Sequence, residues 1–269
     1  MAYQSVKDDT YIIERLQKLT RDHPTEGFWK YNYRLRNAGE TINHKRLHRV
    51  YQQLNLPLRR KCKKRVPARI KEPLVIPESF THTWSIDFMS DAISGSRKFR
   101  TFNVIDDYNR EVLFIEVDYS LKSSRVLWVL RHLVNKFGAP SKIRMDNGPE
   151  FIAQIAHQWS QANGIEFKYI QPGKPMQNAY IERFNKSFRN GVLNACLFEN
   201  LEDVRDQTDQ WVYDYNHHRP HASLGNIPPV TYREKNNKNV KASALHSASA
   251  APSLHSAQKL LNKSLTVEQ

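Results

Sequence analysis

The spacing of hydrophobic residues changes near residue 80. Upstream, apolar side chains recur every three or four positions, which predicts short helices. Downstream, apolar and polar residues alternate in TWSIDFM at 83–89, which predicts a strand with one buried face. Trp84, Ile86 and Phe88 share that face, and Asp87 lies on the other. The chain therefore divides into a helical front part and a mixed second part.

Two helices open the front part. The first covers residues 9–20, with Asp9 or Thr10 as its N-cap, and the His23-Pro24 pair ends it. The apolar face of the first helix consists of Ile12, Leu16 and Leu19. The apolar face of the second consists of Phe28, Tyr31 and Leu35.

A third helix follows a turn at residues 37–39 and is capped by Thr41 or Asn43. Its apolar face consists of Leu47, Val50, Tyr51 and Leu54. Its opposite face carries Lys45, Arg49 and Gln52. A helix, a glycine-containing turn and a helix with a basic outer face are typical of a helix-turn-helix, whose side chains reach phosphates and base edges. An ordinary solvent-exposed face is the alternative.

Positive charge is concentrated at the front of the chain. The 269 residues carry a formal net charge of +14, of which +11 falls in residues 1–75, none in 76–235 and +3 in 236–269. The densest basic run is Arg59, Arg60, Lys61, Cys62, Lys63, Lys64 and Arg65. Such a run repels itself unless a polyanion neutralises it, so we expect it to contact DNA within a linker at 57–78. A solvated linker is the alternative.

Two cysteines and the absence of long apolar runs narrow the class of protein. Cys62 and Cys196 cannot make a disulfide framework, which favours a reducing setting. The sequence has no apolar run near the ~20 residues of a membrane span and no signal-peptide core at its start. We therefore expect no membrane partner and a cytoplasmic, nucleoid-associated location.

The second part alternates strands and helices. Strands are predicted at 83–89, 102–105, 112–117, 142–145 and 166–170. Helices are predicted at 123–137, 150–163 and 177–197, and after Asn200. The order β-β-β-α-β-α-β-α indicates a mixed α/β fold. Loop is predicted after residue 215, and a disordered or weakly helical Ala/Ser-rich tail at 236–269.

Three acids stand out by position. Asp87 lies near the end of the first strand, Asp146 where a short strand stops, and Glu182 in the first turns of the long helix. Carboxylates that converge from strand ends and an adjoining helix suit hard cations, and two such ions can assist an in-line phosphoryl displacement. A cap or a solvated turn residue is the alternative for any single acid. We assign that ordinary role to Asp91, Asp106, Asp107, Asp118 and Glu150.

Five strings carry a family resemblance. They are WSIDFMSDA (84–92), TFNVIDDYNRE (101–111), MDNGPEF (145–151), QPGKPMQNAYIERFN (171–185) and YNHHRPHASLGNIPP (215–229). Together they resemble the OrfB-type transposases of bacterial insertion sequences (the IS-three family), which are integrase-core DDE recombinases. In those recombinases thirty-five residues separate the second Asp from the Glu, as residues 147–181 separate Asp146 from Glu182 here.

The resemblance implies a fold and an activity. It implies a ribonuclease-H-like, mixed five-stranded sheet with flanking helices over residues 79–235, preceded by a helix-turn-helix domain at 1–56. Asp87, Asp146 and Glu182 match the catalytic acids, which would bind two Mg²⁺ or Mn²⁺ ions. The enzyme would cleave at the ends of the element and join the freed 3′-OH to target DNA by transesterification. Contacts with the element's end are expected near Lys174, Asn178 and Lys186.

The implied partners are double-stranded DNA, both terminal repeats and target, and further copies of the chain on paired ends. The product of a first reading frame is a further implied partner. Two functional alternatives stay open: a nuclease of the same fold that only hydrolyses, and a DNA-binding protein without catalysis.

Histidines offer weaker candidates. His44 and His48 have zinc-like spacing, but only Cys62 is nearby and structural zinc takes four ligands. His217, His218 and His221 predict either contact with the DNA backbone or loop packing.

Overall fold

The computed structural model describes residues 8–56, 77–146, 154–171 and 175–237. The chain forms two compact units, residues 1–230 and 231–269, and within the second unit residues 231–237 are helical. The basic run 59–65, Lys174 and the tail 238–269 lie outside the described residues. Within the described ranges, no helix is both long and apolar enough to cross a membrane.

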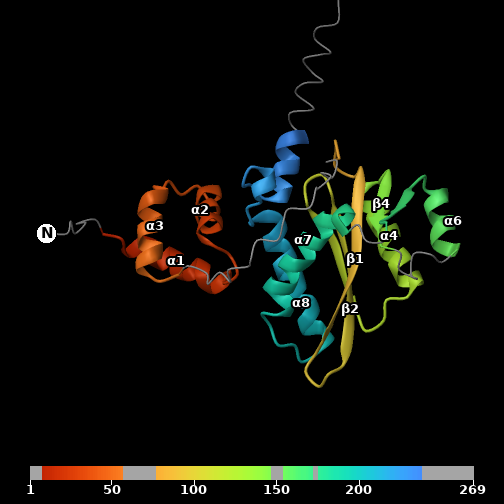
Figure 1. Ribbon diagram of the computed structural model, residues 1–269, viewed down its shortest axis with the longest axis horizontal. Helices are drawn as coiled ribbons and strands as arrows, with labels where there is room; N and C mark the ends of the chain where they lie inside the picture. Colours follow the sequence, from red (N-terminus) through yellow and green to blue (C-terminus); the bar gives the residue numbers. More distant parts are fainter. Residues whose placement is uncertain (1–7, 57–76, 147–153, 172–174, 238–269) are drawn as a thin grey trace, which may run out of the picture. The chain divides into compact units, whose positions relative to one another are not determined.

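The front of the chain folds into α1 (Thr10–Asp22), α2 (Phe28–Asn37) and α3 (His44–Gln53) (Figure 1). Their shared core consists of Ile12, Leu16, Tyr31, Leu35, Leu47, Val50 and Tyr51. The side chain of Asn43 accepts a hydrogen bond from Lys45 N at 2.9 Å, which confirms it as the cap of α3. Asp9 occupies the N-cap position of α1 as predicted, but its side chain makes no capping hydrogen bond and instead accepts from arginines of α3, while Asp8 accepts from Thr10 N.

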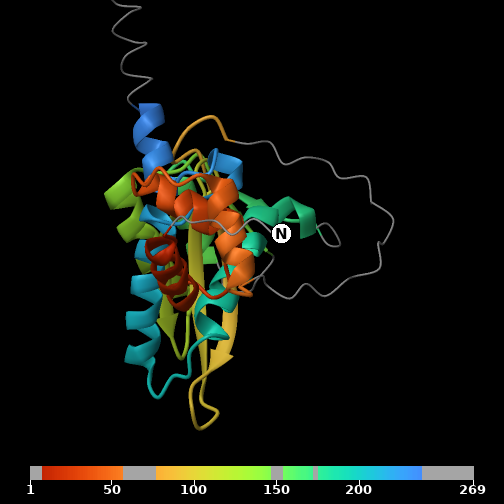
Figure 2. The ribbon, with the colours of Figure 1, turned by 90° about the vertical axis from the view of Figure 1, so that its left-hand side faces the viewer.

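The sheet of the second part is mixed, as predicted. Its described strands are β1 (Thr83–Ala92), β2 (Lys98–Asp106), β3 (Val112–Asp118), β4 (Lys142–Met145) and β5 (Glu166–Tyr169). They lie in the order β3-β2-β1-β4-β5, with β1–β2 and β2–β3 antiparallel and β1–β4 and β4–β5 parallel. The turn between β1 and β2 projects from one end of the sheet in both ribbon views (Figures 1 and 2).

Helices cover both faces of this sheet (Figure 1). On one face, α4 (Ser123–Phe137) and α6 (Gln154–Ala162) share one core with Trp84 and Ile86 of β1. On the other, α7 (Ala179–Phe188) and α8 (Leu201–His217) pack against apolar residues of β2 and β3. Alternation along the strands supplies a different set of side chains to each core. The centre of β1 is therefore enclosed between two helical layers.

The long helix predicted at 177–197 is wrong in its extent. It is divided into a 3₁₀ turn η1 (Pro175–Asn178), α7, and a π-helical turn η2 (Arg189–Leu193). Gly191 lies in this π-helical turn, and a Cβ at that position would overlap Nε1 of Trp211 on α8. The close approach of α8 therefore requires a residue without a side chain at this position. Residues 229–237 are helical where a loop was predicted, after a short 3₁₀ turn η3 (Ala222–Leu224).

Candidate active site

Asp87 lies in the middle of the central strand β1, and its side chain faces α7. Because β1 alternates, Trp84 and Ile86 enter the core beneath α4, whereas Asp87 faces the opposite layer. Its Oδ2 accepts a hydrogen bond from Asn185 Nδ2 on α7 at 2.6 Å, and its Oδ1 accepts from Phe88 N at 2.8 Å. Both contacts fix the carboxylate, and neither neutralises its charge.

A second amide completes this arrangement. Asn103 on β2 pairs with Asp87 across the β1–β2 ladder, and its Nδ2 donates to Asn185 Oδ1 at 2.7 Å. Asn103 is fully buried. Neither asparagine was predicted from the sequence. The three-residue spacing from Glu182 to Asn185 could have placed Asn185 on the catalytic face of the helix, but Asn103 is found only once the strand register is known.

Asp146 follows β4 directly, beside β1. The parallel ladder pairs Ser85 with Arg144, so Asp87 and Asp146 each lie two residues further along neighbouring strands. Burial raises the pKa of Asp87 to about 6, and the negative charges of Asp146 and Glu182 raise it as well. The three acids predicted from the sequence therefore act on one another electrostatically.

The same acids do not form a preassembled chelate. Within the described parts of the chain, no three Asp, Glu, His or Cys side chains are close enough together to hold a metal ion as they stand. Asp87 is half-buried and Glu182 on α7 is exposed. The segments 147–153 and 172–174, which adjoin Asp146 and precede α7, lie outside the described residues. The three carboxylates are hard oxygen donors, but as they stand they do not form a closed coordination sphere.

Asp106 and Asp107 were each predicted to be a cap or a solvated turn residue, and both are buried rather than solvated. Asp107 is buried and pairs with Arg144 Nη1 at 2.7 Å, which ties β4 to the β2–β3 turn. Asp106 is also buried, and its carboxylate accepts from Thr81 N at 2.7 Å and Tyr108 N at 2.8 Å. Burial raises the pKa of Asp106 to about 7. Asp107 supports the site, because its partner Arg144 lies on β4, which leads directly into Asp146. Asp106 instead caps the turn that follows β2.

The predicted DNA-contact residues differ in exposure. Lys45, Gln52 and Lys186 are exposed. Arg49 donates to Asp9 Oδ2 at 2.6 Å, so it is partly engaged within the helical part. Asn178 is 3% exposed, and its buried Oδ1 has no hydrogen-bond partner among the described residues. As it stands, Asn178 is covered rather than presented to DNA.

The histidines divide in the same way. His217 and His218 are exposed and contact the ring of Tyr213. The ring of His221 packs edge-on against Tyr215 at 4.7 Å, and burial lowers the pKa of His221 to about 3. Of the two predictions for these residues, loop packing describes His221.

Comparison with known proteins identifies relatives over most of the chain. Two models of the integrase core domain match residues 79–175 and 163–229. An uncharacterized 39.2 kDa protein of insertion element IS476 from Xanthomonas euvesicatoria is 37% identical over 221 residues, which are 82% of this chain and 64% of that protein. An uncharacterized 31.7 kDa protein of insertion element IS407 from Burkholderia multivorans is 35% identical over 237 residues, 88% of this chain and 86% of its own length.

A solved structure shares the fold. The match is a chain of a simian T-cell lymphotropic virus intasome in complex with the PP2A regulatory subunit B56 gamma, with a TM-score of 0.51 and 16% identity. It covers 82% of this chain and 74% of that chain.

Proposed function

The chain belongs to the integrase-core family of insertion-element transposases, which are DDE polynucleotidyl transferases, and we propose that Asp87, Asp146 and Glu182 are its catalytic carboxylates. The observation that carries this assignment is the placement of the acids: Asp87 and Asp146 lie at matching places beside each other on β1 and after β4, and the helix of Glu182 also carries Asn185, which bonds Asp87. Burial, with a contribution from Asp146 and Glu182, raises the pKa of Asp87 to about 6. An acid at a neighbouring strand end and an acid on a covering helix thus both act electrostatically on the acid of the central strand. Perturbed groups of this kind concentrate at functional sites.

The donor set fits magnesium or manganese. Three carboxylates offer the hard oxygen ligands that these ions prefer, and their mutual repulsion is relieved by a divalent cation. We propose that Asp87, Asp146 and Glu182 hold two such ions. When bound, the ions activate an attacking oxygen and stabilise the leaving oxygen of a phosphodiester. The protein's own contribution is to orient Asp87 through Asn185 and Phe88 N.

The reaction that this site would serve has two steps. Water first displaces the bridging oxygen at an end of the element and frees a 3′-OH. That 3′-OH then attacks a phosphodiester of the target, forming one phosphodiester as another breaks, so no nucleotide cofactor and no covalent protein intermediate are required.

The remaining candidates would hold the DNA. The exposed side chains Lys45 and Gln52 on α3, together with Arg49, would contact the terminal repeat, and Lys186 would lie beside the strand being cut. The basic run 59–65 and Lys174 would add contacts to phosphates. Self-association on paired ends and a contribution from a first-reading-frame product belong to the same proposal.

The test is Asp146→Asn in the full chain. A duplex carrying the inverted repeats that flank the gene is incubated with Mg²⁺ and a target duplex, and cut and joined products are measured. We expect both products to fall about 10³-fold, as for loss of a group that stabilises transition-state charge, while DNA binding stays the same. Asp118→Asn, an acid outside the site, is the matched control.

The outcomes separate the proposed function from its alternatives. If the wild-type protein cuts the DNA but does not join it, the protein is a nuclease that only hydrolyses, and the proposed strand transfer is wrong. An Asp146→Asn protein that cuts and joins at the wild-type rate would overturn the assignment of the carboxylates.

A further inference from the structure

The string YNHHRPH at 215–221 contributes no residue to the carboxylate site, yet it joins three parts of the first unit. Asn216 forms two hydrogen bonds with the first residue of β3: its Nδ2 donates to Val112 O at 2.8 Å, and its Oδ1 accepts from Val112 N at 2.9 Å. The ring of Tyr215 meets that of Phe184 on α7 edge-on at 5.5 Å. The end of α8 is therefore anchored to the sheet and to the helix that carries Glu182.

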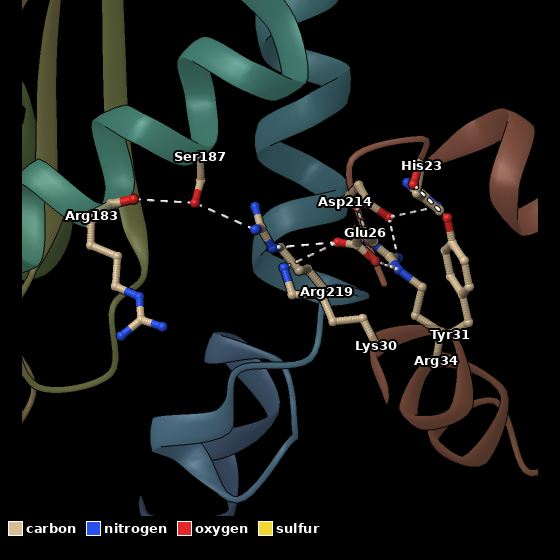
Figure 3. A network of polar contacts seen from close by, with 9 residues as sticks. All are labelled: His23, Glu26, Lys30, Tyr31, Arg34, Arg183, Ser187, Asp214 and Arg219. Carbon is tan, nitrogen blue, oxygen red and sulfur yellow. Dashed lines mark hydrogen bonds and ion pairs between the residues drawn. The ribbon is translucent and has the colours of Figure 1, made fainter. Parts of the chain in front are cut away.

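Arg219 extends this anchor toward the helical front part. Its Nε lies 3.4 Å from Glu26 Oε1, and its Nη2 donates to Ser187 Oγ on α7 at 3.4 Å (Figure 3). Its guanidinium carbon lies 5.2 Å from the ring centroid of Tyr215. The side chain of Arg219 is 15% exposed, so these contacts define most of its surroundings.

Glu26 is itself firmly held. Arg34 on α2 donates to Glu26 Oε2 at 2.7 Å and forks onto both oxygens of Asp214 on α8, at 2.8 and 2.7 Å. Burial alone would raise the pKa of Glu26, but Arg34 holds that pKa below its usual value. Glu26 therefore stays ionised and presents a fixed negative charge to Arg219.

These contacts form one path from the helical part to the catalytic helix. Glu26 fixes Arg219, Arg219 contacts Ser187, and Ser187 Oγ donates to Arg183 O at 3.1 Å, the residue after Glu182. The same helix carries Asn185, which orients Asp87. A shift of Arg219 would act on both groups through the backbone of α7.

We propose that Arg219 is a positioning residue for strand cleavage and joining, which holds α7 in its working place only while Glu26 of the helical part engages it. The helical part, which is proposed to hold DNA, is thereby coupled to the carboxylate site through Glu26, Arg219 and Ser187. This proposal rests on the catalytic role proposed for Glu182.

The experiment compares Arg219→Met, Arg219→Lys and Ser187→Ala in the full chain, with Arg131→Met, an exposed arginine of α4, as control. Amide hydrogen exchange in α7 is measured without metal or DNA, and kcat and KM are measured for joining. We expect Arg219→Met to speed exchange in residues 179–188 about fivefold and to lower kcat about tenfold, with KM for DNA unchanged. Arg219→Lys should recover part of both effects, since it keeps the charge beside Glu26.

Ser187→Ala removes the contact of Arg219 with α7 and the hydrogen bond from Ser187 to Arg183 O, and it leaves the pairing of Arg219 with Glu26 in place. It therefore serves if Arg219→Met fails to fold. It should change α7 exchange and kcat in the same direction as Arg219→Met. Wild-type exchange in α7, or a wild-type kcat despite faster exchange, would overturn the proposal. Because exchange is read without catalysis, it also distinguishes this failure from an active Asp146→Asn protein, which would remove the catalytic assignment instead.

Discussion

Two groups of acids in the first unit have opposite electrostatic surroundings. At the sheet, Asp87 accepts hydrogen bonds from neutral donors. Burial, together with the negative charges of Asp146 and Glu182, raises its pKa to about 6. Between α2 and α8, burial would raise the pKa values of Glu26 and Asp214, yet the Arg34 guanidinium holds both below their usual values. Burial tends to raise the pKa of the acids in both regions, so the presence or absence of a neighbouring arginine decides whether the pKa ends above or below its usual value. The first region is suited to an added divalent cation, whereas the second is satisfied within the chain.

The largest effect on folding is expected from breaking the paired region. Arg34→Met leaves Glu26 and Asp214 without the guanidinium that bridges them, and Arg34 is buried. Removing one partner of a buried pair costs about 3–5 kcal/mol. Urea unfolding at pH 7 should show this loss, whereas Arg131→Met should leave the midpoint unchanged. Equal midpoints for the two variants would mean that the paired region does not stabilise the protein.

A smaller effect is expected from loosening the support of Asp87. Asn185→Ala removes the donor to Asp87 Oδ2 and the acceptor for Asn103. Because an outer hydrogen-bond partner of a metal ligand is worth about 10–100-fold, joining should fall by that factor. Asn190→Ala, an exposed asparagine in the following turn, is the control. Loss of the same size in both variants would point to general disruption of this part of the chain rather than to orientation of Asp87.

The smallest effect concerns pH at the end of α8. His221 has a pKa near 3 because it is buried, with Arg219 and Lys30 nearby. Its ordinary pKa is 6.5, so between pH 6.5 and 3 the unfolded chain binds a proton that the folded chain does not, and stability falls as pH falls. At pH 5.5 this loss is about 1.4 kcal/mol. Urea unfolding at pH 7.5 and 5.5 should show it in the wild-type protein, and His221→Phe should remove that part of the change. The same pH dependence in both proteins would contradict the assignment.

The sequence predicts the elements whose patterns are local. The helix at 123–137 and the strand at 142–145 have the predicted bounds, because each carries an uninterrupted apolar period that ends at a break in the pattern. The orientation of Asp87 also follows from simple alternation in the first strand. The five-stranded mixed sheet is confirmed, and the assignment of Asp87, Asp146 and Glu182 as catalytic acids stays a prediction.

What the sequence misses depends on contacts between distant segments. The predicted 177–197 helix is divided next to Gly191, where Trp211 of α8 approaches closely, and no local pattern contains this contact. The local sequence predicts a turn residue at Asp107, because its ion pair with Arg144 of β4 forms only in the folded sheet. Asn103 and Asn185 meet only through the register of β1 with β2 and the seating of α7. The DNA-contact residues stay a prediction.

The central claim is that Asp87, Asp146 and Glu182 together form a site for divalent cations. Its most direct test is a calorimetric titration of the full chain with Mn²⁺ at pH 7.5, for the wild-type protein, Asp87→Asn, Asp146→Asn, Glu182→Gln and the control Asp118→Asn. We expect each of the three site substitutions to weaken Mn²⁺ binding by at least about tenfold and Asp118→Asn to bind as the wild type does. Wild-type affinity in all three site variants would contradict it.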